Sequence, residues 1–179
     1  MNLVDALLIS VGSLSAIFDL KVRKIPNWLI LVGALSGIVL NGINGLNSFS
    51  QSLAGLAVGI LVLLLPFAFG WIGAGDVKFF GVIGSILGVS WLPRVFFYSA
   101  LVAGVIAVLY VIGGSVRFGR IKDLWTDLKL GVISLGQVMP EPVAVRSRER
   151  GDSVPWGVAF AIGTIIAYYF DHTGQWAGF

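Results

Sequence analysis

Long apolar runs, separated by short joints that contain glycine or polar residues, dominate the hydrophobic pattern of this 179-residue chain. A helix needs roughly 20 mostly apolar residues to cross the hydrocarbon core of a bilayer, and the runs are close to that length. They predict an all-α, polytopic membrane bundle of about six transmembrane helices, in which the second and fourth are short. The predicted spans are Leu3–Leu20, Pro26–Leu40, Leu53–Phe69, Val77–Leu92, Val95–Ile112 and Val154–Phe170.

The composition agrees with this pattern. Hydrophobic residues make up 57% of the chain and charged residues 12%, whereas charged residues account for about a quarter of an ordinary soluble domain. The mean hydropathy is +0.94. Six spans leave little chain for a second, soluble domain, so we expect one membrane-embedded domain over residues 1–179.

Residues suited to bind a metal or a cofactor are scarce. The chain has no cysteine, which excludes disulfides, thiolate zinc sites and thiolate catalysis. The one histidine, His172, has only Asp171 beside it, and this favours a structural or solvated role over metal ligation. We therefore expect no metal and no other cofactor.

Basic residues indicate how the chain is oriented. The net charge of +3 suggests nucleic-acid binding only if basic residues gather on a soluble surface, and here they flank apolar runs, so no nucleic-acid partner is expected. If both termini lie outside, every basic residue except Arg94 falls on the cytoplasmic side, as the positive-inside rule requires. The cytoplasmic set would be Lys21, Arg23, Lys24, Lys78, Arg117, Arg120, Lys122, Lys129, Arg146, Arg148 and Arg150.

One sizeable cytoplasmic segment, at about residues 115–153, has a helical pattern of its own. Its apolar positions recur at helical spacing, with charged residues on the other face. This pattern predicts an interfacial helix on the membrane surface, where anionic lipid favours it. A helix packed against the protein's own loops fits the pattern equally well. The apolar positions are Ile121, Leu124, Trp125, Leu128 and Val132.

Two carboxylates stand at predicted helix ends on the same, cytoplasmic side: Asp19 ends the first span, and Asp76 precedes the fourth. Helix packing can bring such groups together. When two carboxylates share a site, repulsion keeps one protonated, so the pair supplies a base for water and an acid for a carbonyl. The pattern therefore predicts an aspartic-protease pair, without indicating which member is the acid. Gly73 and Gly75 are expected to allow unusual backbone angles and a close approach in the loop before Asp76.

Simpler roles are open for each carboxylate. Asp76 can be just a helix cap, since aspartate is a favoured N-cap residue. Asp19 can simply pair with Lys21 or Arg23 at the membrane interface. In a small transporter or an assembly scaffold, such carboxylates relay protons or bind a cation.

Three short motifs follow one another along the chain: an aspartate ahead of Ile-Pro-Asn, a Gly-x-Gly-Asp-x-Lys, and a Pro-aromatic-Gly near the start of the last span. A lone Gly-x-Gly-Asp is weak support for any function, but the ordered set, over six spans, resembles the type IV prepilin peptidase family across nearly the whole chain. The residues are Asp19, Ile25-Pro26-Asn27, Gly73-Ala74-Gly75-Asp76-Val77-Lys78 and Pro155-Trp156-Gly157.

This resemblance implies an aspartic endopeptidase that needs no metal and removes the basic leader from prepilins and pseudopilins. Cleavage would occur at the cytoplasmic face of the inner membrane, with membrane-inserted precursors and lipids as partners. Asp19 and Asp76 match the catalytic aspartates of the family. For Asn27 and Lys78, the motif fits a role in the contact between helices at least as well as a contact with the substrate. The supporting motif positions are Pro26, Asn27, Gly73, Gly75, Lys78, Pro155 and Gly157.

The length and the motifs also bear on the kind of peptidase. Larger, bifunctional members carry an added cytoplasmic region with paired cysteines that methylates the new N-terminus. The present chain is more similar to short, peptidase-only forms, such as those that serve Flp pili. A presenilin-like intramembrane protease, which shares the Gly-x-Gly-Asp but not the aspartate before Ile-Pro-Asn, is the alternative enzyme.

Overall fold

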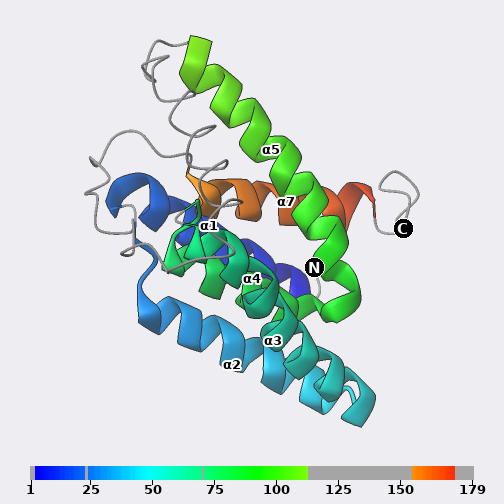
Figure 1. Ribbon diagram of the computed structural model, residues 1–179. Coiled ribbons are helices and arrows are strands. Elements are labelled where there is room, and N and C mark those ends of the chain that lie inside the picture. The colour runs from blue at the N-terminus through cyan, green and yellow to red at the C-terminus, as the bar shows by residue number, and fades with distance from the viewer. Residues whose placement is uncertain (1–2, 23, 70, 113–154, 172–179) are drawn as a thin grey trace, which may run out of the picture.

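The computed structural model describes residues 3–22, 24–69, 71–112 and 155–171 (Figure 1). Within these ranges the chain is helical, with no strand, which confirms the predicted all-α bundle. The helix predicted within residues 115–153 lies outside the described residues. The helices are α1 (Leu3–Val22), α2 (Asn27–Ile43), α3 (Leu46–Ala68), α4 (Ala74–Leu87), α5 (Leu92–Ile112) and α7 (Trp156–Phe170), and a 3-10 turn, η1 (Val89–Trp91), joins α4 to α5.

The helices differ in length, and the difference places them relative to a bilayer. Among the described residues, α1, α3 and the run Val89–Leu109 are long and apolar enough to cross a membrane. Helices α2 and α7 are apolar but have 17 and 15 residues, and α4 has only 14. A 14-residue helix rises about 21 Å, short of the roughly 30 Å hydrocarbon core. The short α4 therefore depends on its neighbours for burial.

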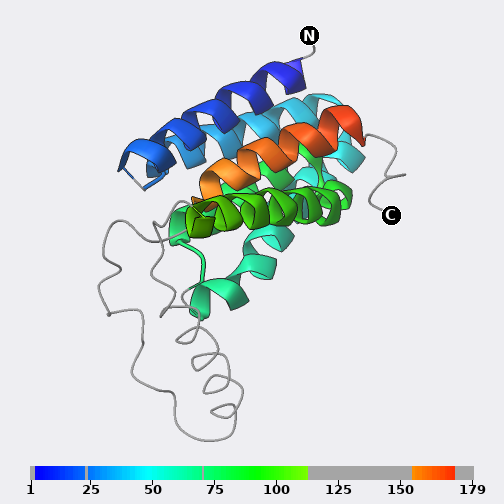
Figure 2. The same cartoon turned by 90° about the horizontal axis from the view of Figure 1, so that it is seen from above.

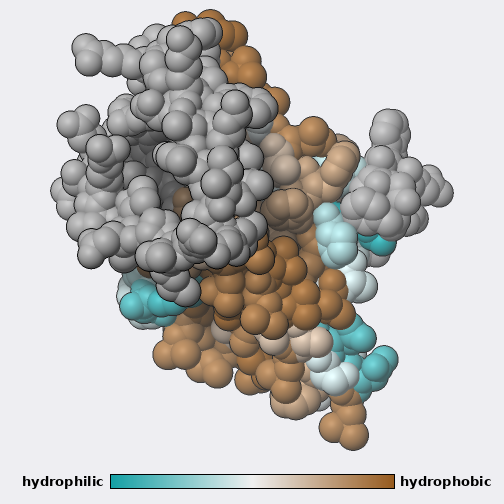
Figure 3. Space-filling view, in the orientation of Figure 1, coloured by the Kyte–Doolittle hydropathy of each residue, from teal (hydrophilic) through white to brown (hydrophobic). Residues whose placement is uncertain are grey.

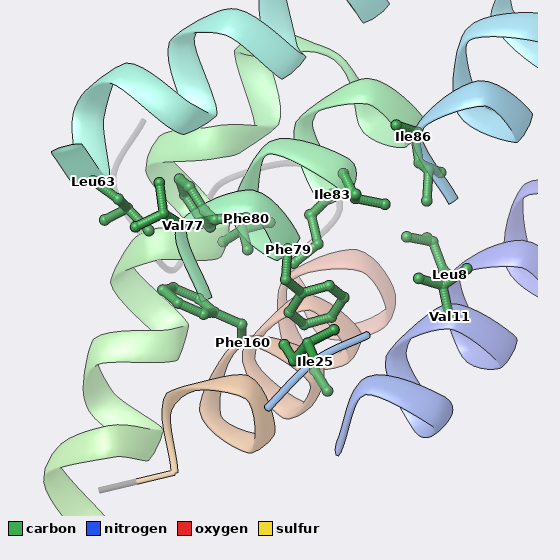
Figure 4. Close-up of a cluster of buried hydrophobic side chains, with 14 of the residues drawn as sticks. Leu8, Val11, Ile25, Leu63, Val77, Phe79, Phe80, Ile83, Ile86 and Phe160 are labelled. Carbon is green, nitrogen blue, oxygen red and sulfur yellow. The ribbon is translucent and has the colours of Figure 1, made fainter. Parts of the chain in front are cut away.

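Helix α4 lies at the centre of the bundle. Every residue from Phe79 to Ile86 is buried, as expected for a helix that is apolar on all sides. Figure 4 shows Phe79, Phe80, Ile83 and Ile86 of α4 in one apolar cluster. Leu8 from α1, Leu63 from α3 and Phe160 from α7 belong to the same cluster. Because its neighbours hold α4 from several sides, the residues in its first turn are placed firmly at one end of the bundle.

The predicted position of the C-terminal end of the fourth span is wrong. Helix α4 ends at Leu87 and not at Leu92, because Gly88 adopts a φ of 92°. This left-handed conformation favours glycine and stops a helix. The chain turns through η1, and α5 already begins at Leu92.

Two glycines make a very close contact between α3 and α4. Gly55 and Gly84 face each other so closely that a Cβ on either residue would overlap the backbone carbonyl of the other. In membranes, small residues of this kind allow helix backbones to touch and pack.

Gly55→Ala is therefore expected to force α3 away from α4 and to destabilise the protein severely, since neither backbone can yield locally. The measurement is the thermal unfolding temperature and the yield of monodisperse protein in detergent. The matched control is Gly104→Ala on α5, where an added Cβ would have no described neighbour within 4 Å. If the two variants unfold at the same temperature, the α3–α4 contact does not limit stability.

Two tyrosine–aspartate hydrogen bonds join helix ends at the end of the bundle where the chain begins. Tyr168 donates to Asp5 Oδ1 in the first turn of α1, and Tyr98 of α5 donates to Asp171 Oδ2, both at 3.0 Å. The start of α1 and the end of α7 thus lie at the same end (Figure 2). An even number of crossings gives this arrangement, although which side of the membrane it faces stays a prediction.

Candidate active site

The motif residues gather at the opposite end of the bundle, where α1 ends and α2, α4 and α7 begin (Figure 1). Three contacts define this end. Asp19 of α1 meets the first turn of α7, Gly75 of α4 lies against Ile25 in the joint between α1 and α2, and Lys78 of α4 bonds to Asn27 of α2. The two aspartates therefore lie at the same end, as the predicted topology requires.

Asp19 points into the bundle and is only 7% exposed. Its Oδ2 accepts a hydrogen bond from the backbone N–H of Val158 at 3.3 Å. Val158 is the third residue of α7, and the first N–H groups of a helix have no partner within the helix. A helix N-terminus also attracts negative charge, so α7 offsets part of the cost of burying this carboxylate.

Gly157 is what allows Asp19 to reach the backbone of α7. A Cβ at Gly157 would lie 2.9 Å from Asp19 Oδ2 and 3.0 Å from its Cβ and Cγ, which leaves no room for a side chain. Pro155 precedes α7 as its N-cap residue, and its carbonyl accepts the N–H of Ala159 at 3.2 Å. The Pro-aromatic-Gly motif thus starts α7 and shapes the surface against which Asp19 packs.

Asp76 lies in the first turn of α4 and is half-buried. Its Oδ2 accepts the N–H of Gly73 at 3.2 Å, while the carbonyl of Gly73 accepts the N–H groups of Asp76 and Val77. The N-cap residue is Gly73, so Asp76 caps α4 from the third helical position. Asp76 thus helps to cap α4, as considered above, although it is not itself the N-cap residue. The same hydrogen bond fixes the position of its carboxylate.

One half of the prediction for the two motif glycines, an unusual backbone angle, is wrong. Gly73 has a φ of −79°, and positive φ angles occur in the described residues only at Gly45 and Gly88, so Gly73 and Gly75 adopt no unusual backbone angle. A Cβ at Gly73 would lie 3.0 Å from Asp76 Oδ2, whereas one at Gly75 would lie an ordinary 3.5 Å from Ile25. Space for the returning carboxylate is therefore the reason for glycine at position 73.

Lys78 and Asn27 bridge α4 and α2 beside this loop. Lys78 Nζ donates to Asn27 Oδ1 at 3.1 Å, and both residues are exposed. Pro26, predicted in the first turn of the second helix, lies directly before α2 as its N-cap residue. Its carbonyl accepts the N–H groups of Leu29 and Ile30. The bridge and the cap together fix the start of α2 relative to the Gly-x-Gly-Asp loop.

Two features of this end were missed from the sequence. One is the Val158 N–H that holds Asp19. The other is Ser15, one turn before Asp19, whose Oγ is buried without a hydrogen-bond partner among the described residues. Helical spacing could have indicated the second, because Asp19 continues a buried stripe on α1 that includes Leu8, Val11 and Ser15.

The described residues contain no group of three or more His, Cys, Asp or Glu side chains placed to hold a metal ion. We therefore assign no metal ligand at this end. The chemistry that the site offers from its described residues is that of two carboxylates, each with one oxygen fixed by a backbone N–H.

Comparison with known proteins finds similarity to one protein family. Residues 6–108 match the model of the type IV leader peptidase family. The chain is 33% identical over 108 residues to the prepilin leader peptidase/N-methyltransferase of Bacillus subtilis (strain 168). That match covers 59% of this chain and 44% of the relative, so the chain spans less than half of the relative's length. No solved structure matches. Helix α7, which contacts Asp19, lies beyond the residues that match the family.

Proposed function

This chain belongs to the type IV leader peptidase family, and we propose that it is a membrane aspartic endopeptidase that cleaves the basic leader from prepilin-like precursors. One observation carries the proposal: Asp19 and Asp76, from separate helices, lie at the same end of a membrane bundle and are each fixed by a backbone N–H. Such fixed placement is what a reacting pair needs, because catalysis by positioned groups depends on geometry.

In the proposed reaction the two carboxylates share one proton and act as a unit. The ionised member takes a proton from water as the water oxygen bonds to the scissile carbonyl carbon. The protonated member donates a hydrogen bond to the carbonyl oxygen as negative charge develops there. A proton then passes to the amide nitrogen, the C–N bond breaks, and a carboxylic acid and a new N-terminal amine are released. Neither aspartate is assigned as the acid.

The other motif residues have structural roles in this proposal. Gly73 and Gly157 leave space for the two carboxylates. Lys78 and Asn27 bond to each other and keep α4 in place beside α2. Pro26 and Pro155 begin the helices at this end, and we propose that the whole chain, 1–179, forms one domain around it. None of these six residues is required to transfer a proton.

We further propose that the site faces the cytoplasm at the inner membrane. Of the basic residues within the described ranges, Lys21, Lys24 and Lys78 are exposed at the end that carries the aspartates, while Arg94 follows η1 at the other end. Cytoplasmic ends of membrane proteins are enriched in lysine and arginine. This distribution supports a site at which a precursor presents its cytoplasmic leader.

The test is a cleavage assay with the full chain in vesicles of phosphatidylethanolamine and phosphatidylglycerol. A prepilin-like precursor from the same genome is expected to lose its leader, as mass spectrometry of the product's N-terminus would show. EDTA should leave the rate unchanged. A precursor with an unrelated signal peptide is the control and should stay intact. Cleavage of that control alone would indicate a presenilin-like protease, and proton uptake by sealed vesicles without any cleavage would indicate a transporter.

A further inference from the structure

A cavity of about 210 Å³ lies between α3 and α5, outside the candidate site. We call it the α3–α5 groove. Helix α4 forms its floor, α3 and α5 form its walls, and η1 closes one side. All of its lining side chains are apolar. They are Val58, Val62, Phe80, Val89, Leu92, Pro93 and Phe96.

The volume of the groove indicates what it could hold, although the groove is open on one side and is not an enclosed void. Protein interiors contain few voids larger than a water molecule. An apolar cavity of about 150 Å³ stays dry and takes up benzene. A cavity of 210 Å³ is therefore large enough for one or two aliphatic or aromatic side chains.

The groove opens to the outer surface of the bundle. Val62 on α3 is 50% exposed and Phe96 on α5 is 39% exposed, so a neighbouring helix can reach the cavity from the side. Figure 3 shows that the described surface around these helices is mainly apolar. The lining offers no partner for a charged group, which excludes a basic leader as the occupant.

Helix α4 connects the groove to the candidate site. Phe80 of the groove floor comes four residues after Asp76, so the two side chains share one face of α4 with Cβ atoms about 5–6 Å apart. From Phe80 the lining continues to Val89 and Leu92, at the end of the bundle away from the aspartates. A chain in the groove would thus begin one helical turn from Asp76 and run toward the opposite face of the membrane.

We propose that the α3–α5 groove docks the apolar membrane helix of the precursor, just after the scissile bond. This inference rests on the proposed function, because a precursor cut near Asp76 must send its apolar helix across the membrane in the direction that the groove follows. The helix would insert large apolar side chains at helical spacing, in the way that amphipathic helices bind hydrophobic grooves. Docking there would place the peptide bond that precedes the helix at Asp76.

The absence of cysteine makes this docking measurable by single-cysteine cross-linking. Val62→Cys and Phe96→Cys probe the groove, and Leu35→Cys on α2, which is 52% exposed and outside the groove, is the matched control. Each cysteine variant also carries Asp19→Asn, which is expected to prevent cleavage. It is mixed in vesicles with a precursor that has one cysteine in the first two turns of its apolar helix. Disulfide cross-links are expected at the two groove positions and not on α2.

A second variant tests whether docking contributes to cleavage. Val62→Trp, which fills the groove, is expected to raise KM for the precursor at least about tenfold with little change in kcat, whereas Leu35→Trp should leave both unchanged. Equal thermal unfolding temperatures of the two variants would exclude misfolding as the cause.

The outcomes separate the groove from the proposed function. If the wild-type protein cleaves the precursor but cross-links form equally on α2 and in the groove, the docking role of the groove is wrong. The proposed function would still stand. A photoreactive acyl chain that labels Val62→Cys and is not displaced by excess precursor would show that the groove holds lipid instead. Failure of the wild-type protein to cleave any precursor would overturn the proposed function, and the docking role with it.

Discussion

Asp19→Asn and Asp76→Asn are each expected to abolish leader cleavage, with a fall in rate of at least about a hundredfold. An amide has nearly the volume of the carboxylate but can neither take a proton from water nor share one with its partner. The Oδ1 of an asparagine at position 19 can still accept the Val158 N–H, so the contact between α1 and α7 should persist. The measurement is the rate of product formation in vesicles, with helix content and unfolding temperature recorded for each variant.

A carboxylate at the other end of the bundle supplies the control. Asp5 is also half-buried and also accepts a hydrogen bond, from Tyr168. Asp5→Asn is expected to cleave at the wild-type rate. The double variant Asp19→Asn/Asp76→Asn should be no slower than either single variant, because residues that act as a unit are not additive. Wild-type cleavage by either single variant would remove the aspartate pair from the mechanism.

Within the residues that the structure describes, the number and type of helices could be predicted from the sequence because the physical requirement is simple. Apolar runs favour burial in a bilayer as helices, where every backbone group is satisfied internally. A short helix such as α4 is buried by its neighbours instead. Helix ends were predicted less well. Helix α3 begins at Leu46 and not at Leu53, since polar residues such as Asn47 and Ser50 occupy its first turns and interrupt the apolar pattern. The end of α4 depends on the φ angle of Gly88, which composition does not reveal.

The site could be predicted only in part, for a similar reason. Topology places Asp19 and Asp76 at one end because it depends only on the order of the helices. The partner of Asp19 could not be predicted, because Val158 lies 139 positions away and meets it only through the packing of α1 on α7. The prediction for Gly73 named both an unusual angle and a close contact, because glycine permits both; the coordinates show the close contact and an ordinary angle.

Gly157→Ala is expected to lower kcat roughly 10- to 100-fold and to lower the unfolding temperature moderately, while leaving KM nearly unchanged. The added Cβ would press on three atoms of Asp19 within 3.0 Å. Turning the carboxylate away from the Val158 N–H relieves the contacts with Oδ2 and Cγ, and a small shift of α1 against α7 relieves the contact with the Asp19 Cβ. A displacement of about 1 Å in a reacting group can cost a factor of about a hundred in rate. The KM should hold because the α3–α5 groove lies away from the α1–α7 contact. The measurement is steady-state cleavage of a precursor in vesicles.

The same interface provides the matched control for Gly157→Ala. At Gly12 on α1 an added Cβ would lie 3.7 Å from the Cβ of Ala161 on α7, an ordinary contact. Gly12→Ala is therefore expected to cleave like the wild type. If both variants lose activity equally, crowding between α1 and α7 is the cause, and Asp19 has no special dependence on position 157. If only Gly157→Ala loses activity, Gly157 sets the position of the proposed catalytic carboxylate of Asp19. Gly157 lies outside residues 6–108, the part of the chain that matches the family. The working site would then require α7 as well as the two aspartates.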